Sequence, residues 1–276
     1  MNFNKSVDFI KPRKINRDAP LFVYLPGMDG TGELLQTQAD KLAFCFDLRC
    51  VSIRTDNYSN WQTLARDTVE LIEKEITKKT NKEVYLCGES FGGCLALKTA
   101  LAAPSLFKKL ILVNPASSFN QFPILGLGVN ITPWLPTWLH RYSAAGLLPF
   151  LAKLNRINDC DRLKLVESMK SLPPEVVSWR LSLLRDFKVA EEQLRNLKIS
   201  TLVVAGAEDS LLPSVAEANK LISLLPQAQK TVLPQSGHAC LLETSVNLYD
   251  ILVKENFIQP SPFSLLKAEI GELTTP

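Results

Sequence analysis

A serine between two glycines is the first feature of this sequence that could carry covalent chemistry. Residues 88–92 are Gly-Glu-Ser-Phe-Gly, which matches the pattern G-x-S-x-G around Ser90. A serine hydroxyl is a poor nucleophile at neutral pH, so it needs an imidazole to take its proton and a carboxylate to orient that imidazole. Acyl transfer at Ser90 therefore requires one histidine and one acidic residue elsewhere. The alternative is an ordinary turn with Ser90 as a helix N-cap.

The chain contains two histidines, and His238 is the one placed for this role. It follows a short apolar run in the tripeptide Ser-Gly-His, whereas His140 is expected at a surface or an interface. Asp209 follows another apolar run, with Glu208 as the neighbouring competitor. The order serine, acid, histidine is the one expected when the serine stands at a strand-to-helix turn. We predict Ser90, Asp209 and His238 as nucleophile, orienting acid and base.

A glycine-rich loop near the N-terminus could stabilise the oxyanion that acyl transfer generates. The tetrahedral intermediate needs two preplaced hydrogen-bond donors. One would be the backbone N–H of Phe91, directly after the serine, and we assign the other to the N–H of Met28 in the loop 26–32. Gly27 and Asp29 of this loop are expected to lie against the substrate. The alternative is a plain glycine turn.

The hydrophobic pattern predicts a scaffold whose strand ends could bring these residues together. Short apolar runs alternate with segments of helical period, which is typical of a parallel sheet with helices on both faces. Functional groups gather at the carboxyl ends of such strands. The predicted fold class is therefore α/β, with a mostly parallel central sheet. Strands are expected at 21–25, 48–53, 83–87, 110–113, 199–205 and 230–233, and helices at 61–76, 90–103, 215–225 and 241–253.

The alternation stops between residues 116 and 197, where no strand is predicted. We interpret 116–197 as a helical cap inserted into a core made of 1–115 and 198–276. The cap contains an apolar, proline-broken stretch with Trp134 and Trp138. These residues are expected to pack on the core, to line an acyl-chain pocket, or to touch a membrane interface, where tryptophan is favoured.

Composition excludes several classes of function. A net charge of +3 is too small a bias to predict a nucleic-acid partner. Two histidines and no Cys-x-x-Cys pair predict no metal site, and the chemistry needs no cofactor. The six cysteines are expected to be reduced, with Cys87 and Cys94 buried. The first residues form no apolar signal region, and no run of about 20 apolar residues occurs. The expected location is the cytoplasm, with or without peripheral membrane contact.

Taken together, these motifs resemble the α/β-hydrolase superfamily, which implies an α/β-hydrolase fold with a helical cap. A narrower resemblance is to the hydrolase half of the phytyl ester synthases of plastids and cyanobacteria. It implies a lipid-related acyl substrate and a photosynthetic source such as a cyanobacterium. The superfamily motifs lie at 25–30, 88–93, 203–209 with Pro213, and 236–238 with Glu243, and the narrower ones at 25–32, 88–97 and 114–119.

Two departures from that resemblance limit the expected activity. The usual histidine before the oxyanion glycine is Pro26 here, as in the narrower family. An acyltransferase domain with an H-x4-D motif is absent, since Ala145 and Glu243 stand at that spacing after the two histidines. We expect a serine acyl hydrolase that acts on an apolar acyl ester. The alternatives are acyl transfer from the same serine to phytol or diacylglycerol, a lyase or other cofactor-free reaction, and a non-catalytic lipid-binding protein.

Overall fold

A seven-stranded sheet forms the centre of the computed structural model, which describes residues 5–56, 58–121 and 148–260. The strand order is β1-β3-β2-β4-β5-β6-β7, and every neighbouring pair is parallel except β1 with β3. The predicted α/β fold with a mostly parallel sheet is confirmed. The strands are β1 Val7–Ile10, β2 Leu21–Leu25, β3 Asp47–Ile53, β4 Val84–Glu89, β5 Lys109–Val113, β6 Ser200–Gly206 and β7 Ala228–Leu233.

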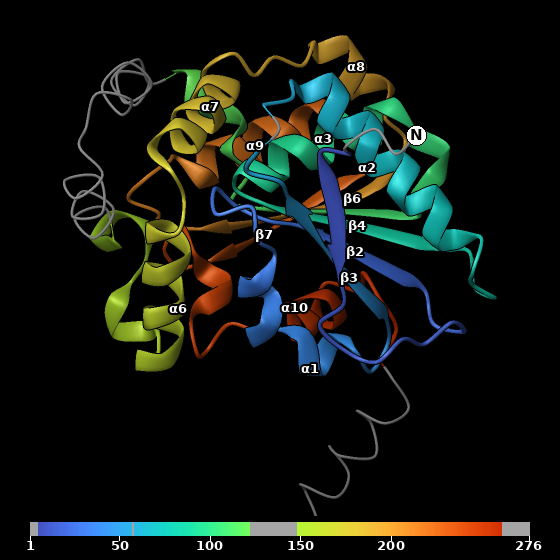
Figure 1. Ribbon diagram of the computed structural model, residues 1–276, viewed down its shortest axis with the longest axis horizontal. Helices are drawn as coiled ribbons and strands as arrows, with labels where there is room; N and C mark the ends of the chain where they lie inside the picture. The colour runs from blue at the N-terminus through green and yellow to red at the C-terminus, as the bar shows by residue number, and fades with distance from the viewer. Residues whose placement is uncertain (1–4, 57, 122–147, 261–276) are drawn as a thin grey trace, which may run out of the picture.

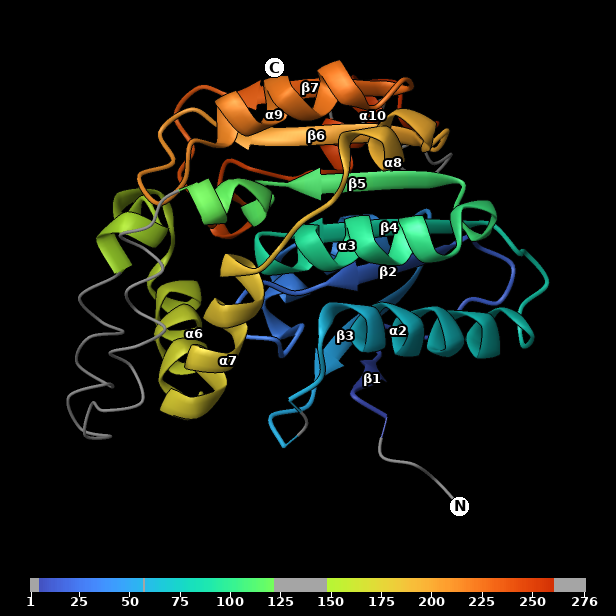
Figure 2. The same cartoon turned by 90° about the horizontal axis from the view of Figure 1, so that it is seen from above.

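Helices cover both faces of this sheet, as Figures 1 and 2 show. Helices α2, α3, α8 and α9 lie on one face, and α1 and α10 lie on the other. The α-helices are α1 Ala39–Leu42, α2 Trp61–Ile76, α3 Phe91–Ala102, α6 Asp159–Lys170, α7 Pro174–Arg185, α8 Glu191–Asn196, α9 Ser214–Leu224 and α10 Leu248–Lys254. The 3-10 helices are η1 Glu33–Thr37, η2 Pro104–Leu106, η3 Ala116–Gln121, η5 Leu154–Arg156 and η6 Cys240–Leu242.

Strand β2 illustrates why the central strands are apolar throughout. Leu21, Val23 and Leu25 join the core on the α2 and α3 side, and Phe22 and Tyr24 join the core on the α1 and α10 side. A strand covered on both faces buries successive side chains in opposite directions, so its sequence shows no polar alternation. The six predicted strands are confirmed within two residues at each end.

Two predictions about elements need correction. The single helix expected at 241–253 is wrong, because the chain forms η6, then an extended link, then α10. The backbone becomes extended at Glu243, whose side chain accepts the N–H of Gly237. Asn247 then starts a new helix, because its side chain accepts the N–H of Asp250. Strand β1 was not predicted. It is a short edge strand that pairs antiparallel with β3, and its Val7 is buried in the core on the α2 side.

The described part of the segment 116–197 contains helices and no strand. Its helices α6 and α7 stand at the end of the sheet to which the parallel strands point (Figure 2). Residues 122–147, with Trp134, Trp138 and His140, lie outside the described residues. The division into core and cap therefore stays a prediction. Within the described ranges, no helix is long and apolar enough to cross a membrane. Cys87 and Cys94 are buried, as predicted, and all six cysteines are free thiols.

Candidate active site

Ser90 lies in the turn between β4 and α3 and has a strained backbone conformation with a positive φ. Its φ of 53° and ψ of −113° lie outside the regions that a non-glycine residue prefers. Its N–H donates to the carbonyl oxygen of Val113 at 3.0 Å. Its own carbonyl accepts the N–H groups of Gly93 at 2.9 Å and Ala116 at 3.0 Å. Three hydrogen bonds thus maintain a strained serine at the carboxyl end of a central strand.

The two glycines of the motif are required by close backbone approach. A Cβ on Gly92 would lie 2.0 Å from the carbonyl oxygen of Leu25, and a Cβ on Gly88 would lie 2.2 Å from that of Gly92. Both contacts are with backbone atoms, which cannot rotate away as a side chain can. The start of α3 therefore reaches β2 and β4 only because these positions lack side chains.

The three residues predicted for catalysis form one hydrogen-bonded chain. Nε2 of His238 lies 2.8 Å from Oγ of Ser90, and Nδ1 lies 2.7 Å from Oδ2 of Asp209. The side chains of His238 and Asp209 are 4% and 1% exposed. The tautomer that satisfies both contacts donates from Nδ1 to the carboxylate and accepts at Nε2 from the serine hydroxyl. The sheet supplies these residues from the ends of β4, β6 and β7.

The surroundings of Asp209 keep its carboxyl group ionised. Oδ1 accepts the N–H groups of Leu211 at 2.9 Å and Leu212 at 3.0 Å, and the hydroxyl of Ser214 donates to Oδ2. Burial by itself raises the pKa of Asp209, but the hydrogen bond and charge of His238, together with these donors, bring it below its ordinary value. The competing Glu208 is exposed and pairs with Lys153 at 2.9 Å instead.

The glycine-rich loop lies against Ser90. A Cβ on Gly27 would be 3.9 Å from Cβ of Ser90, and the N–H of Gly30 closes a turn by donating to the carbonyl of Gly27 at 3.1 Å. Among the described residues, no acceptor takes the N–H of Met28 or of Phe91. The carboxylate of Asp29 is buried within its own loop, where Oδ2 accepts two hydrogen bonds from Thr31.

Asn114 is a residue of the site that the sequence did not reveal. Its Nδ2 donates to the carbonyl oxygens of His238 at 2.6 Å and Gly237 at 3.1 Å, and its Oδ1 accepts the N–H of Gly206 at 2.8 Å. The residue is fully buried and has a φ of 40°. It joins the ends of β5 and β6 to the loop that carries His238. In the sequence, Asn114 ended a predicted strand and opened the motif 114–119, but neither pattern gave it a role in the site.

Glu243 holds the same loop from its other side. Oε1 accepts the N–H of Gly237 at 2.8 Å, while Oε2 accepts the hydroxyl of Ser236 at 3.0 Å and Nε of Arg156 at 2.7 Å. Glu243 is 2% exposed, so the Arg156 guanidinium is the cation that compensates its burial. The loop of His238 is thus constrained by side chains on both sides.

Glu89, directly before Ser90, is a second buried carboxyl group near the serine. Burial raises its pKa to about 7, with a smaller contribution from the charge of Asp29. The hydroxyl of Tyr24 donates to its Oε2 and, with the charge of His238, opposes that rise. This group changes its charge near neutral pH, next to the candidate nucleophile.

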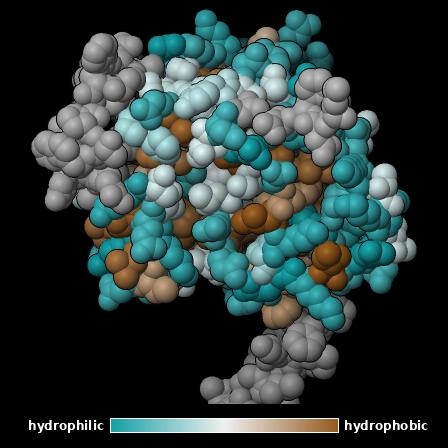
Figure 3. Space-filling view, in the orientation of Figure 1, coloured by the Kyte–Doolittle hydropathy of each residue, from teal (hydrophilic) through white to brown (hydrophobic). Residues whose placement is uncertain are grey.

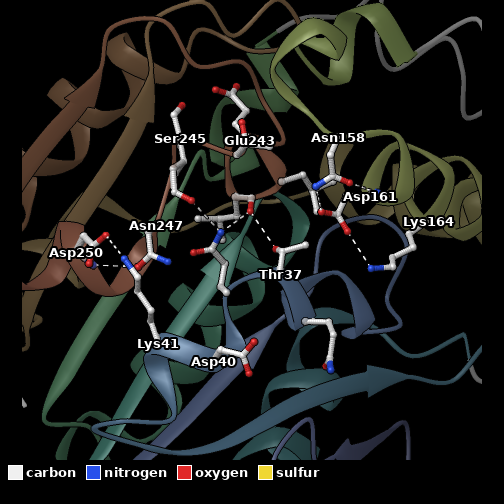
Figure 4. Close-up of a pocket in the computed structure, with 16 residues that line it drawn as sticks. Thr37, Asp40, Lys41, Asn158, Asp161, Lys164, Glu243, Ser245, Asn247 and Asp250 are labelled. Carbon is white, nitrogen blue, oxygen red and sulfur yellow. Dashed lines mark hydrogen bonds and ion pairs between the residues drawn. The ribbon is translucent and has the colours of Figure 1, made fainter. Parts of the chain in front are cut away.

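A cavity of about 550 Å³ lies beside the segment that follows His238, and it does not include the three residues of the hydrogen-bonded chain. Four of its charged lining residues pair with each other, since Lys41 contacts Asp250 at 2.6 Å and Lys164 contacts Asp161 at 2.9 Å (Figure 4). In the described ranges, no group of three metal-ligating side chains occurs.

One curated relative reproduces the narrower resemblance. The chain is 32% identical over 262 residues to phytyl ester synthase 1, chloroplastic, of Arabidopsis thaliana. The match covers 85% of this chain but 36% of that protein, so the chain spans about a third of the relative's length.

Solved structures and a family model agree on the fold. MenH from S. aureus superimposes with a TM-score of 0.74 at 16% identity, covering 92% of this chain and 99% of the other. The enol-lactonase from Burkholderia xenovorans LB400 superimposes with a TM-score of 0.75 at 14% identity, covering 91% and 96%. The model of the family described as serine aminopeptidase, S33, matches residues 53–245. The chain therefore belongs to the serine aminopeptidase S33 family and has the α/β-hydrolase fold.

Proposed function

We propose that this chain is a serine-dependent carboxylic ester hydrolase that acts through an acyl-Ser90 intermediate. The observation that carries the proposal is the hydrogen-bonded chain from Asp209 through His238 to Ser90, at 2.7 and 2.8 Å. A buried, ionised carboxylate on Nδ1 stabilises the imidazolium that forms when Nε2 takes a proton.

The proposed reaction has two half-reactions. Oγ of Ser90 attacks the ester carbonyl carbon as its proton moves to Nε2 of His238. The tetrahedral oxyanion accepts the N–H groups of Met28 and Phe91, the two donors that have no acceptor among the described residues. The intermediate collapses as His238 returns the proton to the leaving alcohol. Water then attacks the acyl carbon and gives a proton to His238, which passes that proton to Oγ of Ser90 as the bond to the acyl group breaks and the carboxylic acid leaves.

An apolar acyl ester is the substrate class that we propose. The relative named phytyl ester synthase supports it, since a phytyl ester has a long hydrocarbon chain. The apolar stretch with Trp134 and Trp138 supports an acyl-chain pocket by composition. The name of the same relative favours a second candidate, in which a lipid alcohol replaces water as the acceptor. The apolar stretch with Trp134 and Trp138 also supports peripheral contact of the cap with a membrane.

Replacement of Ser90 tests the proposal directly. Ser90→Ala should lower kcat for p-nitrophenyl esters by on the order of 10⁴ or more, because the remaining groups cannot form the acyl intermediate. A fluorophosphonate should label Ser90 in the wild type and nothing in the variant. Ser223→Ala is the matched control, because the hydroxyl of this exposed serine donates to the carbonyl of Lys220 in its own helix, and its loss should leave both readouts unchanged.

Contrary results would identify the alternatives. Undiminished turnover in Ser90→Ala would require another nucleophile. No labelling and no turnover of any ester in the wild type would favour a non-catalytic lipid-binding protein. Adding phytol or diacylglycerol to an acyl donor distinguishes the acceptors, since transfer yields a new ester and hydrolysis yields free acid.

A further inference from the structure

Arg180 of α7 is fully buried beneath the glycine-rich loop, although α7 lies in the segment that we interpret as the cap. Its Nη1 donates to the carbonyl oxygen of Met28 at 2.6 Å, and its Nη2 donates to that of Ile53 at 3.2 Å. Burial lowers the pKa of Arg180 to about 10, against the charge of Asp29. The guanidinium therefore keeps its charge at neutral pH and makes charge-assisted hydrogen bonds with two neutral carbonyls.

The two carbonyls belong to different strand ends. Met28 follows β2, and Ile53 is the last residue of β3. Ile53 also donates its N–H to the carbonyl of Gly30 at 2.7 Å, so the turn 27–30 is attached to β3 both directly and through Arg180. Only a planar fork can reach both carbonyls, because a lysine ammonium is a single point on a flexible chain.

Gly30 is shaped to receive this guanidinium. A Cβ at Gly30 would lie 2.4 Å from Nη1 and 2.5 Å from Nη2 of Arg180, and Gly30 has a φ of +66°. The turn therefore wraps around the guanidinium with no room for a side chain. The Met28 carbonyl held by Arg180 is in the central peptide of that turn, which is the peptide whose rotation converts one turn type into another.

We propose that Arg180 is a positioning residue that holds the turn 27–30 so that the N–H of Met28 stays directed at the oxyanion beside Ser90. Arg180 itself touches no reacting atom. This inference rests on the function proposed above. It assigns to α7 a fixed role in the reaction, because the helix that supplies Arg180 cannot leave the core without releasing the oxyanion loop.

Substitutions of Arg180 should separate kcat from KM. In Arg180→Met and Arg180→Lys, kcat for p-nitrophenyl butyrate should fall on the order of 10- to 100-fold, because a misaligned donor loses transition-state stabilisation. KM should stay within about twofold, and the pH dependence of kcat/KM should keep its wild-type midpoint, because His238 and Asp209 are untouched. The control is Arg185→Ala on the same helix, whose exposed side chain pairs with Asp186 and should leave kcat unchanged.

Gly30→Ala provides a second route that retains Arg180. The added methyl group must displace the guanidinium, so kcat should fall in the same range as for Arg180→Met. In the double variant, the second substitution should have much less effect than in the wild type, because the two act on one contact. If Arg180→Met does not fold, the effects of Gly30→Ala, Arg180→Lys and their double variant on kcat are compared instead.

Two results would overturn the inference. One is a folded Arg180 or Gly30 variant with kcat within twofold of the wild type. The other is a loss that appears only in KM. Failure of the proposed function looks different, since fluorophosphonate would then not label Ser90 even in the wild type. Normal labelling of the wild type with unaffected Arg180 variants contradicts this inference alone.

Discussion

At the scale of single residues, the site combines two carboxyl groups, Asp209 and Glu89, whose pKa values are shifted in opposite directions. The side chain of Asp209 is buried but accepts hydrogen bonds from His238, Ser214 and two backbone N–H groups, so its pKa is lowered. Glu89 is also buried, but Tyr24 is the donor that reaches it, so burial raises its pKa to about 7. The number of donors, rather than burial, decides which carboxyl group is ionised beside Ser90.

Glu89 should make the protein less stable as the pH rises towards neutral. Unfolded, this carboxyl has an ordinary pKa of 4.5, whereas in the fold it retains its proton up to about 7. Its favourable contribution is complete below pH 4.5 and is lost as the pH rises through 7. The difference in pKa corresponds to on the order of 3 kcal/mol. Urea unfolding at pH 5, 6, 7 and 8 should show this fall in the wild type and not in Glu89→Gln.

Exposed Glu192 offers the matched control for that comparison. Glu192→Gln should follow the wild-type curve at every pH. If Glu89→Gln loses as much stability between pH 5 and 8 as the wild type, another group titrates there and Glu89 is not responsible.

At the scale of elements, the site depends on how closely α3 approaches the sheet. Gly92 at the start of α3 lies against the backbone of Leu25 at the end of β2, which is also where the glycine-rich loop begins. The same approach places Ser90 beside that loop, where a Cβ on Gly27 would lie 3.9 Å from Cβ of Ser90. Backbone proximity therefore brings together the nucleophile turn and the loop, and the glycines of the motif are its condition.

Gly92→Ala should be one of the most destabilising single substitutions in the chain. The methyl group would stand 2.0 Å from a carbonyl oxygen that no rotamer change can move. We expect a loss of unfolding free energy on the order of 3 kcal/mol or more, or no folded protein. Gly27→Ala is the control, since its nearest contact would be 3.6 Å, and its stability should change by less than about 1 kcal/mol. Similar urea midpoints for the two variants would contradict this explanation.

At the scale of the whole molecule, the segment interpreted as a cap contacts the rest of the chain at the candidate site itself. Arg180 binds the carbonyl of Met28 in the glycine-rich loop, and Arg156 binds Glu243, which holds the His238 loop. The described part of this segment exposes apolar groups, with Phe150 52% and Leu163 62% exposed. Figure 3 shows apolar patches among hydrophilic side chains, one of them over α6. Such a surface supports contact between the cap and a lipid interface.

Flotation with vesicles of phosphatidylcholine and phosphatidylglycerol tests this contact. The wild type should float with the vesicles, and Trp134→Ala with Trp138→Ala should bind them several-fold less, since tryptophan favours the interface. Ile15→Ala, which removes an exposed apolar side chain outside the cap, should bind as the wild type does. Unchanged flotation of the double tryptophan variant would show that these residues do not touch the membrane.

Local patterns in the sequence were enough to predict much of the fold and to select Ser90, Asp209 and His238 as site residues. Apolar runs buried on both faces mark the strands, helical period marks α2 and α9, and glycines around Ser90 mark a tight turn. Asp209 and His238 could be selected because parallel strands end at one edge, so chain order constrains which residues meet there. The edge strand β1 and the break before α10 escaped because they depend on pairing and on side-chain contacts with distant backbone.

Only the tertiary structure decided what orients those residues. Asn114, Glu243 and Arg180 act on backbone N–H and carbonyl groups of loops far away in the chain. Every residue carries such backbone groups, so the sequence does not show which of them a given side chain binds. Nor does the sequence of α7 show that Arg180 is buried while Arg185 is exposed. The sequence by itself determined which groups could react. The packing of α7 and of the strand ends decided how they are held.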